Sequence, residues 1–355
     1  MRFLRGGTIA LAALCMSVAA APAHATQLMA MPALDAAIEN RDYRRIEAVI
    51  VERGGVVQFE NYYGDTNAET RIDARSAGKS ITALAVGIAI DEGALRGVDA
   101  RVFDLLAGRA PFEHDNELKR AIIVRDFLTM SSALDCNDWE PSPGNEERMY
   151  DRRDWTRFAL DIPIAQDYAR DESGFGRYSY CTAGAFLLGR VVERATGAPF
   201  DDYVQNRIFT PLGIEGAIWR RSPSGEVQSG GQLSLRARDF TAIGRMILNR
   251  GVDGAGNRIV SRAWLNEMFQ PVRRATPADA YGYLWWIRNY RTANRTYTAF
   301  YMSGNGGNKV VLLPEIDAVV VLLSTFYNQR TMHQQTNDII EQHVLPALEA
   351  ADAAG

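Results

Sequence analysis

The sequence centres on Arg75-Ser76-Ala77-Gly78-Lys79-Ser80, which precedes the apolar run Ile81-Thr82-Ala83-Leu84-Ala85-Val86-Gly87-Ile88-Ala89-Ile90. Ser76 and Lys79 are three residues apart, so on a helix both side chains lie on one face, about one turn apart. The run that follows is apolar nearly all round, which predicts a buried helix. Burial disfavours the ammonium form of Lys79, and a neutral amine can accept a serine proton. The stretch therefore predicts a buried helix with Ser76 as a candidate nucleophile.

This spacing has a second interpretation, because a short motif also occurs by chance. Ser76 would then only cap the helix, and Lys79 would extend into solvent. The chain has three lysines among its 39 basic residues. The rest of the sequence has to distinguish the two interpretations.

The composition predicts a soluble globular protein. The chain has 355 residues, of which 47% are hydrophobic and 23% charged, enough to form a large core in one elaborate domain or two. The formal net charge is −4 at pH 7. We therefore expect neither nucleic acid nor an anionic membrane as a partner.

The N-terminus predicts a secretory signal peptide over residues 1–25. Arg2 and Arg5 precede a short apolar core, and Ala23-His24-Ala25 forms an A-x-A cleavage site before Thr26. No later stretch reaches 18 uncharged apolar residues, so no membrane anchor is predicted. The expected location is the periplasm or the outside of the cell.

Few residues suit a metal or a redox site. Cys136 and Cys181 remain after the predicted cleavage, and in an oxidising compartment they form either one disulfide or two buried free thiols. The remaining histidines have no ligand-type spacing; they are His114, His333 and His343. We expect no metal and no organic cofactor.

The order of predicted elements indicates an α+β fold. Strands are expected near both chain ends, in a hairpin across Gly54-Gly55 and in four runs at 281–286, 297–302, 310–313 and 318–323. Helices are expected at 32–40, 102–106, 123–130, 183–196, 200–208, 234–250 (begun by a Ser cap) and 331–345 (ended by Pro346). One domain over 26–350 results: an antiparallel sheet flanked by helices (26–98 and 230–350) and a mainly helical lobe (99–229).

The candidate nucleophile needs a base and a proton donor. No Gly-x-Ser-x-Gly elbow occurs, and the three histidines lie in polar or amphipathic segments. A Ser-His-Asp triad is thus weakly supported. Lysine and tyrosine remain as the candidate acid–base groups.

At this point the sequence resembles a known family, the serine hydrolases related to class C β-lactamases and penicillin-binding D,D-peptidases. The resemblance covers residues 45–345 and rests on the order of several motifs. These are Ser76 to Ser80, Phe127 to Leu134, Tyr180 to Gly189, Pro211-Leu212-Gly213, Arg236 to Asp239 and Ser303-Gly304-Asn305-Gly306-Gly307. It implies a β-lactamase/transpeptidase-like fold.

The resemblance also implies roles for individual residues. Ser76 would be the nucleophile, Lys79 its proton acceptor or electrostatic activator, and Tyr180 a shared base and acid. The backbone N–H groups of Ser76 and Asn305 would form the oxyanion hole. Ser303, Gly304 and Thr182 would lie beside the substrate.

Two departures from the family pattern bear on specificity. Thr182 stands where the family often has Asn, and Met302 stands where β-lactamases and D,D-peptidases have the Lys of K-T-G, which pairs with a substrate carboxylate. The form Ser303 to Gly307 is similar to the esterase and 6-aminohexanoate-dimer hydrolase branch. Tyr178 permits a second register for the catalytic tyrosine, but only Tyr180 aligns the motif through Gly189.

The sequence thus predicts a secreted serine hydrolase that cleaves small esters or amides through an acyl-enzyme. Two alternatives are a D,D-peptidase or weak β-lactamase, and a catalytically silent ligand-binding protein of the same fold. Specificity is expected in the loops of residues 136–175, where a Cys136–Cys181 bond would tie the helical lobe to the segment of Tyr180. The sequence predicts neither the natural substrate nor the oligomeric state.

Overall fold

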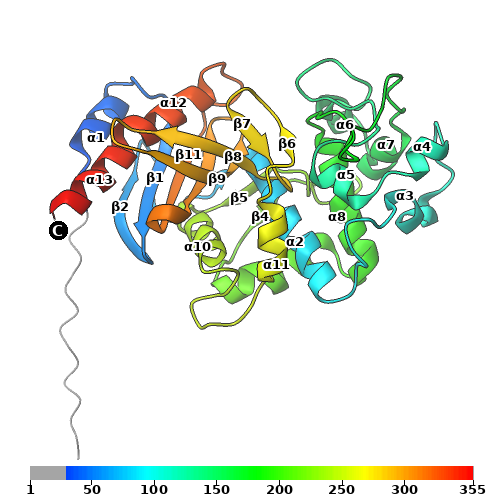
Figure 1. Ribbon diagram of the computed structural model, residues 1–355, viewed down its shortest axis with the longest axis horizontal. Coiled ribbons are helices and arrows are strands. Elements are labelled where there is room, and N and C mark those ends of the chain that lie inside the picture. The colour runs from blue at the N-terminus through cyan, green and yellow to red at the C-terminus, as the bar shows by residue number, and fades with distance from the viewer. Residues whose placement is uncertain (1–28, 355) are drawn as a thin grey trace, which may run out of the picture.

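The largest element of the computed structural model, which describes residues 29–354, is an eight-stranded antiparallel sheet (Figure 1). The strand order is β2-β1-β11-β10-β9-β8-β7-β6. The strands are β1 (Ile46–Arg53), β2 (Val56–Tyr62), β6 (Arg273–Arg274), β7 (Asp279–Tyr281), β8 (Trp286–Arg291), β9 (Thr296–Gly304), β10 (Asn308–Leu313) and β11 (Ala318–Ser324). The predicted signal peptide, residues 1–25, lies outside the described residues.

The two ends of the chain meet in this sheet. Strand β1 pairs with β11, with Val49 opposite Leu322. The β1–β2 hairpin turns at Gly54 and Gly55, whose φ angles of 59° and 80° are accessible to glycine at no steric cost. The predicted single sheet built from both chain ends is confirmed.

Helices cover both faces of the sheet. On one face, α1 (Pro32–Glu39), α12 (Met332–Ile339) and α13 (Leu345–Ala354) contribute Leu34, Ile339 and Leu348 to a core with Val49 and Val311. On the other face lie α2 (Gly78–Asp91) and α10 (Ala237–Leu248), in a larger core that also includes the helical region. Within residues 29–354, no helix is long and apolar enough to cross a membrane.

The helical region lies at one end of the sheet, at the right of Figure 1. It contains α3 (Val102–Leu105), α4 (Glu117–Arg120), α5 (Val124–Leu128), α6 (Glu146–Tyr150), α7 (Trp155–Asp161), α8 (Thr182–Thr196) and α9 (Phe200–Val204). Helix α11 (Arg262–Met268) and a small sheet of β3 (Ile72–Asp73), β5 (Leu233–Leu235) and β4 (Ile218–Trp219) complete the chain. The expected α+β class is confirmed.

Helix α2 is the buried helix predicted from the apolar run. Every residue from Gly78 to Ala89 is buried. Gly87 has no side chain because the Trp264 indole occupies that space: a Cβ there would lie 2.2 Å from it. The Trp264 Nε1–H also donates a 3.0 Å hydrogen bond to the carbonyl oxygen of Ala83. Because α2 is enclosed on all sides, its first turn is held rigidly in the interior.

Pro346 does not end the last helix, so that prediction is wrong. A π-helical turn (Ile340–Val344) joins α12 to α13, and the N–H of Leu345 bonds to the carbonyl oxygen five residues earlier, on Ile340. A widened turn of this kind gives the proline ring the space that a regular α-helix denies it. Another π turn, Gln205–Phe209, precedes Pro211.

Two boundaries also differ from the predictions. Ser234 lies in β5 and does not cap α10. Instead, the carboxylate of Asp239, in the first turn of α10, accepts from the N–H of Arg236, the residue before the helix, at 3.0 Å. The predicted strand over 281–286 is interrupted after Tyr281. The N–H of Leu284 donates to the carbonyl oxygen of Leu128 at 2.8 Å, which turns the chain toward α5. Residues 136–175, expected to form loops, contain the two short helices α6 and α7.

Candidate active site

Ser76 and Lys79 are in direct contact at the start of α2. Ser76 lies in a short 3₁₀ turn, Arg75–Ala77, that leads into the helix. The Lys79 Nζ donates a 2.9 Å hydrogen bond to the Ser76 Oγ. The Lys79 side chain is only 1% exposed, so it is no solvent-facing lysine. The interpretation of Ser76 as a simple helix cap therefore does not fit the structure.

Tyr180 is the third member of this group. It lies immediately before α8, and Lys79 Nζ is 4.9 Å from the centroid of its ring. Burial raises the pKa of the Tyr180 phenol, whereas the nearby charge of Lys79 and the Ser76 hydroxyl lower that pKa. Tyr178 instead packs edge-on against Tyr281, with ring centroids 5.4 Å apart. Of the two candidate tyrosines, Tyr180 is thus the one that lies beside Lys79 and Ser76.

The end of strand β9 lies against the Ser76 turn. A Cβ on Gly304 would be 1.8 Å from the carbonyl oxygen of Ala74, so only glycine permits this approach. The side chain of Asn305 is turned toward Asn328, to which its Nδ2 donates at 2.6 Å. Asn305 therefore offers its backbone to the site, and its amide side chain is already bound. Ser303 lies one residue before Gly304 and is largely buried.

Thr182, the first residue of α8, is tied to an acidic residue that sequence reasoning missed. Its N–H donates a 2.6 Å hydrogen bond to the carboxylate of Asp138. The hydroxyl of Thr182 is buried and has no hydrogen-bond partner among the residues described. Asp138 thus anchors the backbone at Thr182, and the Thr182 hydroxyl is not engaged by it.

Asp138 is fixed on three sides. Besides the bond from Thr182, its carboxylate accepts from the N–H of Glu146 at 2.9 Å, and its own N–H donates to the carbonyl oxygen of Tyr180 at 2.8 Å. Burial and the charge of Glu146 raise the pKa of Asp138 to about 6, although Lys79 acts in the opposite direction. No sequence motif marks this residue. Its proximity to Cys136 was the one available signal.

A disulfide joins Cys136 to Cys181 in the structure. Cys136 precedes Asp138 by two residues, and Cys181 lies between Tyr180 and Thr182. The Ser179 Oγ also donates to the carbonyl oxygen of Cys136 at 2.7 Å. The loop that carries Asp138 is therefore attached directly to the segment that carries Tyr180.

Three aromatic rings surround the outer side of the site. Trp139 stacks on Tyr180, with centroids 5.3 Å apart and planes 7° from parallel. Trp286 lies 6.0 Å from Tyr180 and 6.4 Å from Trp139. Trp285 is instead fully buried in the core. Of these two neighbouring tryptophans, Trp285 therefore belongs to the core and Trp286 to the wall of the site.

A glycine pair between β4 and β5 was also missed by sequence reasoning. A Cβ on Gly231 would lie 3.2 Å from the Cα of Ser76, and one on Gly230 would lie 2.8 Å from the carbonyl oxygen of Thr182. The N–H of the next residue, Gln232, donates to the carbonyl oxygen of Arg75 at 2.9 Å. These glycines let the chain pass closely behind both the Ser76 turn and α8.

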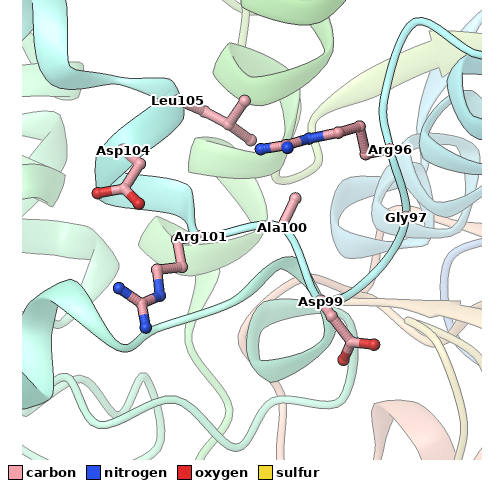
Figure 2. Close-up of a pocket in the computed structure, with 7 residues that line it drawn as sticks. All are labelled: Arg96, Gly97, Asp99, Ala100, Arg101, Asp104 and Leu105. Carbon is pink, nitrogen blue, oxygen red and sulfur yellow. The ribbon is translucent and has the colours of Figure 1, made fainter.

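A hollow of about 610 Å³ lies at residues 96–105, apart from the group around Ser76 (Figure 2). It is lined by Arg96, Gly97, Asp99, Ala100, Arg101, Asp104 and Leu105, and none of the predicted site residues is among them. In Figure 2 the guanidinium of Arg96 extends toward Leu105. Among the residues described, no group of three or more His, Cys, Asp or Glu side chains is arranged to hold a metal ion.

The group around Ser76 has the parts needed for acyl transfer. It provides a hydroxyl, an amine in hydrogen-bond contact with it, a buried phenol and a closely approaching strand end. The amine lies 4.9 Å from the centroid of the phenol ring, so both acid–base groups flank the hydroxyl of Ser76. This is the chemistry of a serine nucleophile without a histidine.

Comparisons with known proteins agree with this geometry. The sequence model of the Beta-lactamase family matches residues 34–344. A 6-aminohexanoate-dimer hydrolase from Paenarthrobacter ureafaciens is 28% identical over 305 residues, covering 81% of this chain and 74% of that protein. Penicillin-binding protein 4 from Amycolatopsis lactamdurans is 30% identical over 224 residues, 56% of either chain. The solved structure of a D-stereospecific amidohydrolase from Streptomyces sp. matches in fold, with a TM-score of 0.65 at 18% identity over 87% of this chain and 98% of that one.

Proposed function

The chain belongs to the Beta-lactamase family and is a serine hydrolase, and from this we propose that it cleaves small esters or amides through an acyl-enzyme on Ser76. The resemblance read from the sequence and the β-lactamase/transpeptidase-like fold are confirmed. The observation that carries the proposal is the 2.9 Å hydrogen bond between Lys79 Nζ and Ser76 Oγ, next to the ring of Tyr180.

In the proposed reaction the Ser76 Oγ attacks the carbonyl carbon of the substrate. The serine proton passes to the Lys79–Tyr180 pair, and Tyr180 then gives a proton to the departing oxygen or nitrogen. Water afterwards attacks the acyl-enzyme by the reverse proton route. Lys79 supports Tyr180 throughout, because a positive charge near the phenol favours its ionised form.

The developing oxyanion is assigned to the backbone N–H groups of Ser76 and Asn305. Support comes from Gly304, whose lack of a side chain brings the end of β9 against the Ser76 turn. Donors fixed in this way need no reorganisation during the reaction. Thr182, Ser303 and Gly304 are proposed to border the substrate.

Met302 argues for esters or simple amides over β-lactams and D-Ala peptides. Its side chain is a neutral thioether that is fully buried in the core, so it cannot pair with a substrate carboxylate as a lysine would. The likeness to a 6-aminohexanoate-dimer hydrolase supports an amide or related ester substrate. A D,D-peptidase or weak β-lactamase is the second candidate, favoured by the likeness to penicillin-binding protein 4.

A periplasmic or extracellular location belongs to the same proposal. Its supports are the signal peptide predicted at residues 1–25 and the Cys136–Cys181 disulfide, because such bonds persist in oxidising compartments. Detection of the protein beginning at Thr26 in a periplasmic or culture fraction is the expected result. A full-length cytosolic protein would contradict it.

Turnover of four substrates by the mature protein tests the choice of substrate. We expect hydrolysis of p-nitrophenyl butyrate and of a small anilide, with nitrocefin turned over at least 100-fold less efficiently and penicillin acylating the protein slowly. Efficient nitrocefin turnover or rapid acylation by penicillin would favour the second candidate. The absence of an acyl adduct with every substrate and with a fluorophosphonate would favour the silent ligand-binding protein.

A further inference from the structure

Trp139 is the exposed aromatic side chain among the residues described. It is 54% exposed, whereas Trp155 and Trp285 are 1% and 0% exposed. Large aromatic side chains are normally highly buried in a folded protein, whereas Trp139 keeps an exposed ring beside the candidate active site. Trp139 is also the ring that stacks on Tyr180, at 5.3 Å between centroids.

The position of Trp139 is fixed by the surrounding loop. The preceding residue, Asp138, bonds to the carbonyl oxygen of Tyr180, and the N–H of Trp139 itself donates to the Oδ1 of Asn137 at 2.9 Å. The Cys136–Cys181 disulfide ties the same loop to Tyr180. A ring held in this way pays little entropy when it binds a ligand, so it is preorganised for contact.

The ring borders a hollow of about 580 Å³ on the outer side of the site. The rest of its lining is mixed: two residues are prolines, Pro141 and Pro143, and the others are polar or charged, namely Asp138, Glu140, Ser142, Asn145 and Arg148. Within this mixed lining the Trp139 ring is the flat apolar surface, and a flat aromatic group is the partner that packs best on it.

The role of Tyr180 decides which part of a substrate meets Trp139. This step rests on the proposed function, in which Tyr180 protonates the departing oxygen or nitrogen. The group attached to that atom must then lie beside the Tyr180 hydroxyl, and Trp139 is stacked on the same ring. Trp286 lies beside the same two rings, with its centroid 6.0 Å from Tyr180 and 6.4 Å from Trp139.

We propose that Trp139 forms the wall of a leaving-group subsite that selects aromatic alcohols and aromatic amines. In acylation, a bond forms between Ser76 Oγ and the carbonyl carbon, the bond from that carbon to the leaving oxygen or nitrogen breaks, and the serine proton ends on the leaving group. The aromatic group departs at this step. Trp139 therefore acts on acylation and has no part in the hydrolysis of the acyl-enzyme that remains.

Two esters that form the same acyl-enzyme separate these effects. 2-Naphthyl butyrate and trifluoroethyl butyrate share the butyryl group and differ in whether the leaving group is flat. Trp139→Ala is expected to lower kcat/KM about tenfold for the naphthyl ester and less than about twofold for the trifluoroethyl ester. Trp139→Phe keeps a flat ring and should stay within about threefold of the wild type on both. Leu118→Ala, which removes a comparably exposed side chain on α4 (48% exposed), should change neither ester.

The decay rate of the butyryl-enzyme, measured after a burst, is the decisive second readout. It should be the same in the wild type and Trp139→Ala. An equal loss on both esters, a loss in Trp139→Phe as large as in Trp139→Ala, or a change confined to the decay rate would overturn the proposal. A failure of the proposed function gives a different result, because no butyryl adduct would then form on Ser76 in any of these proteins.

Discussion

The backbone N–H of Thr182 donates a 2.6 Å hydrogen bond to the carboxylate of Asp138, which places a half-buried acid beside the proton-transfer residues. The charged groups around it are Glu146 on α6 and Lys79 on α2, and the neutral phenol of Tyr180 lies nearby. Burial and Glu146 raise the pKa of this carboxyl group, so ionising Asp138 costs free energy in the folded protein.

This cost gives the first prediction, the pH dependence of stability in Asp138→Asn. The pKa of Asp138 rises from 3.8 in the unfolded chain to about 6, so the wild type loses stability as pH rises through this window, while the asparagine variant does not titrate. Between pH 4 and pH 7 the unfolding free energy of Asp138→Asn should therefore rise by about 2 kcal/mol relative to that of the wild type. Urea unfolding at several pH values measures it. A difference that is constant with pH, or that moves the other way, would contradict the assignment.

The second prediction compares the two neighbouring tyrosines. Tyr180→Phe removes the proposed acid–base hydroxyl and should lower kcat by about 10²- to 10⁴-fold. Tyr178→Phe is the matched control, because the Tyr178 hydroxyl is buried and has no hydrogen-bond partner among the residues described. Its activity should stay within about twofold of the wild type. The reverse pattern would assign the role to Tyr178.

The third prediction concerns the close approach of β9 to the Ser76 turn. In Gly304→Ala the new Cβ would lie 1.8 Å from the carbonyl oxygen of Ala74, so the strand end must move away. Losing one oxyanion donor costs about 10²- to 10³-fold in kcat, and overpacking costs about 1–3 kcal/mol of stability. Gly108→Ala, where a Cβ meets no atom within 4 Å, is the control. If Gly304→Ala kept the wild-type kcat, the assignment of the Asn305 N–H to the oxyanion hole would be wrong.

The fourth prediction concerns the disulfide. It closes a loop with a sequence separation of 45 residues. The double variant Cys136→Ala/Cys181→Ala should lose roughly 2–4 kcal/mol of unfolding free energy, mainly because the unfolded chain gains freedom. Chemical denaturation of the variant beside the wild type, without reductant, tests this. Identical unfolding midpoints would show that the two cysteines are not bonded in the protein in solution.

The sequence predicts best those elements whose cause is local. Helix α2 follows from an apolar run, and α8 ends where Gly197 adopts a φ of 74°, as its place in the sequence suggested. The hairpin across Gly54-Gly55 was predicted for a similar reason, whereas the single sheet built from both chain ends was inferred from the order of strands and helices along the chain. The proximity of Ser76, Lys79 and Tyr180 was expected from the family motifs, and their contacts in the structure match it.

The missed features arise from contacts between distant segments. Asp138 reaches the site only because its loop folds back onto Tyr180, and nothing in its neighbouring residues indicates this. The Asn305 side chain is bound by Asn328, a residue 23 positions later. Pro346 was expected to end a helix, but the π turn before it depends on how α12 and α13 pack on the sheet. Such pairings are decided by tertiary packing, which local sequence patterns do not encode.

The most direct test of the account is the identity of the nucleophile. The mature protein and Ser76→Ala are mixed with p-nitrophenyl butyrate, the burst is recorded by stopped flow, and the quenched protein is measured by intact mass and peptide mapping. The account predicts a burst and one butyryl group on Ser76 in the wild type, and neither in Ser76→Ala. An adduct on another residue, or equal activity in both proteins, would contradict it.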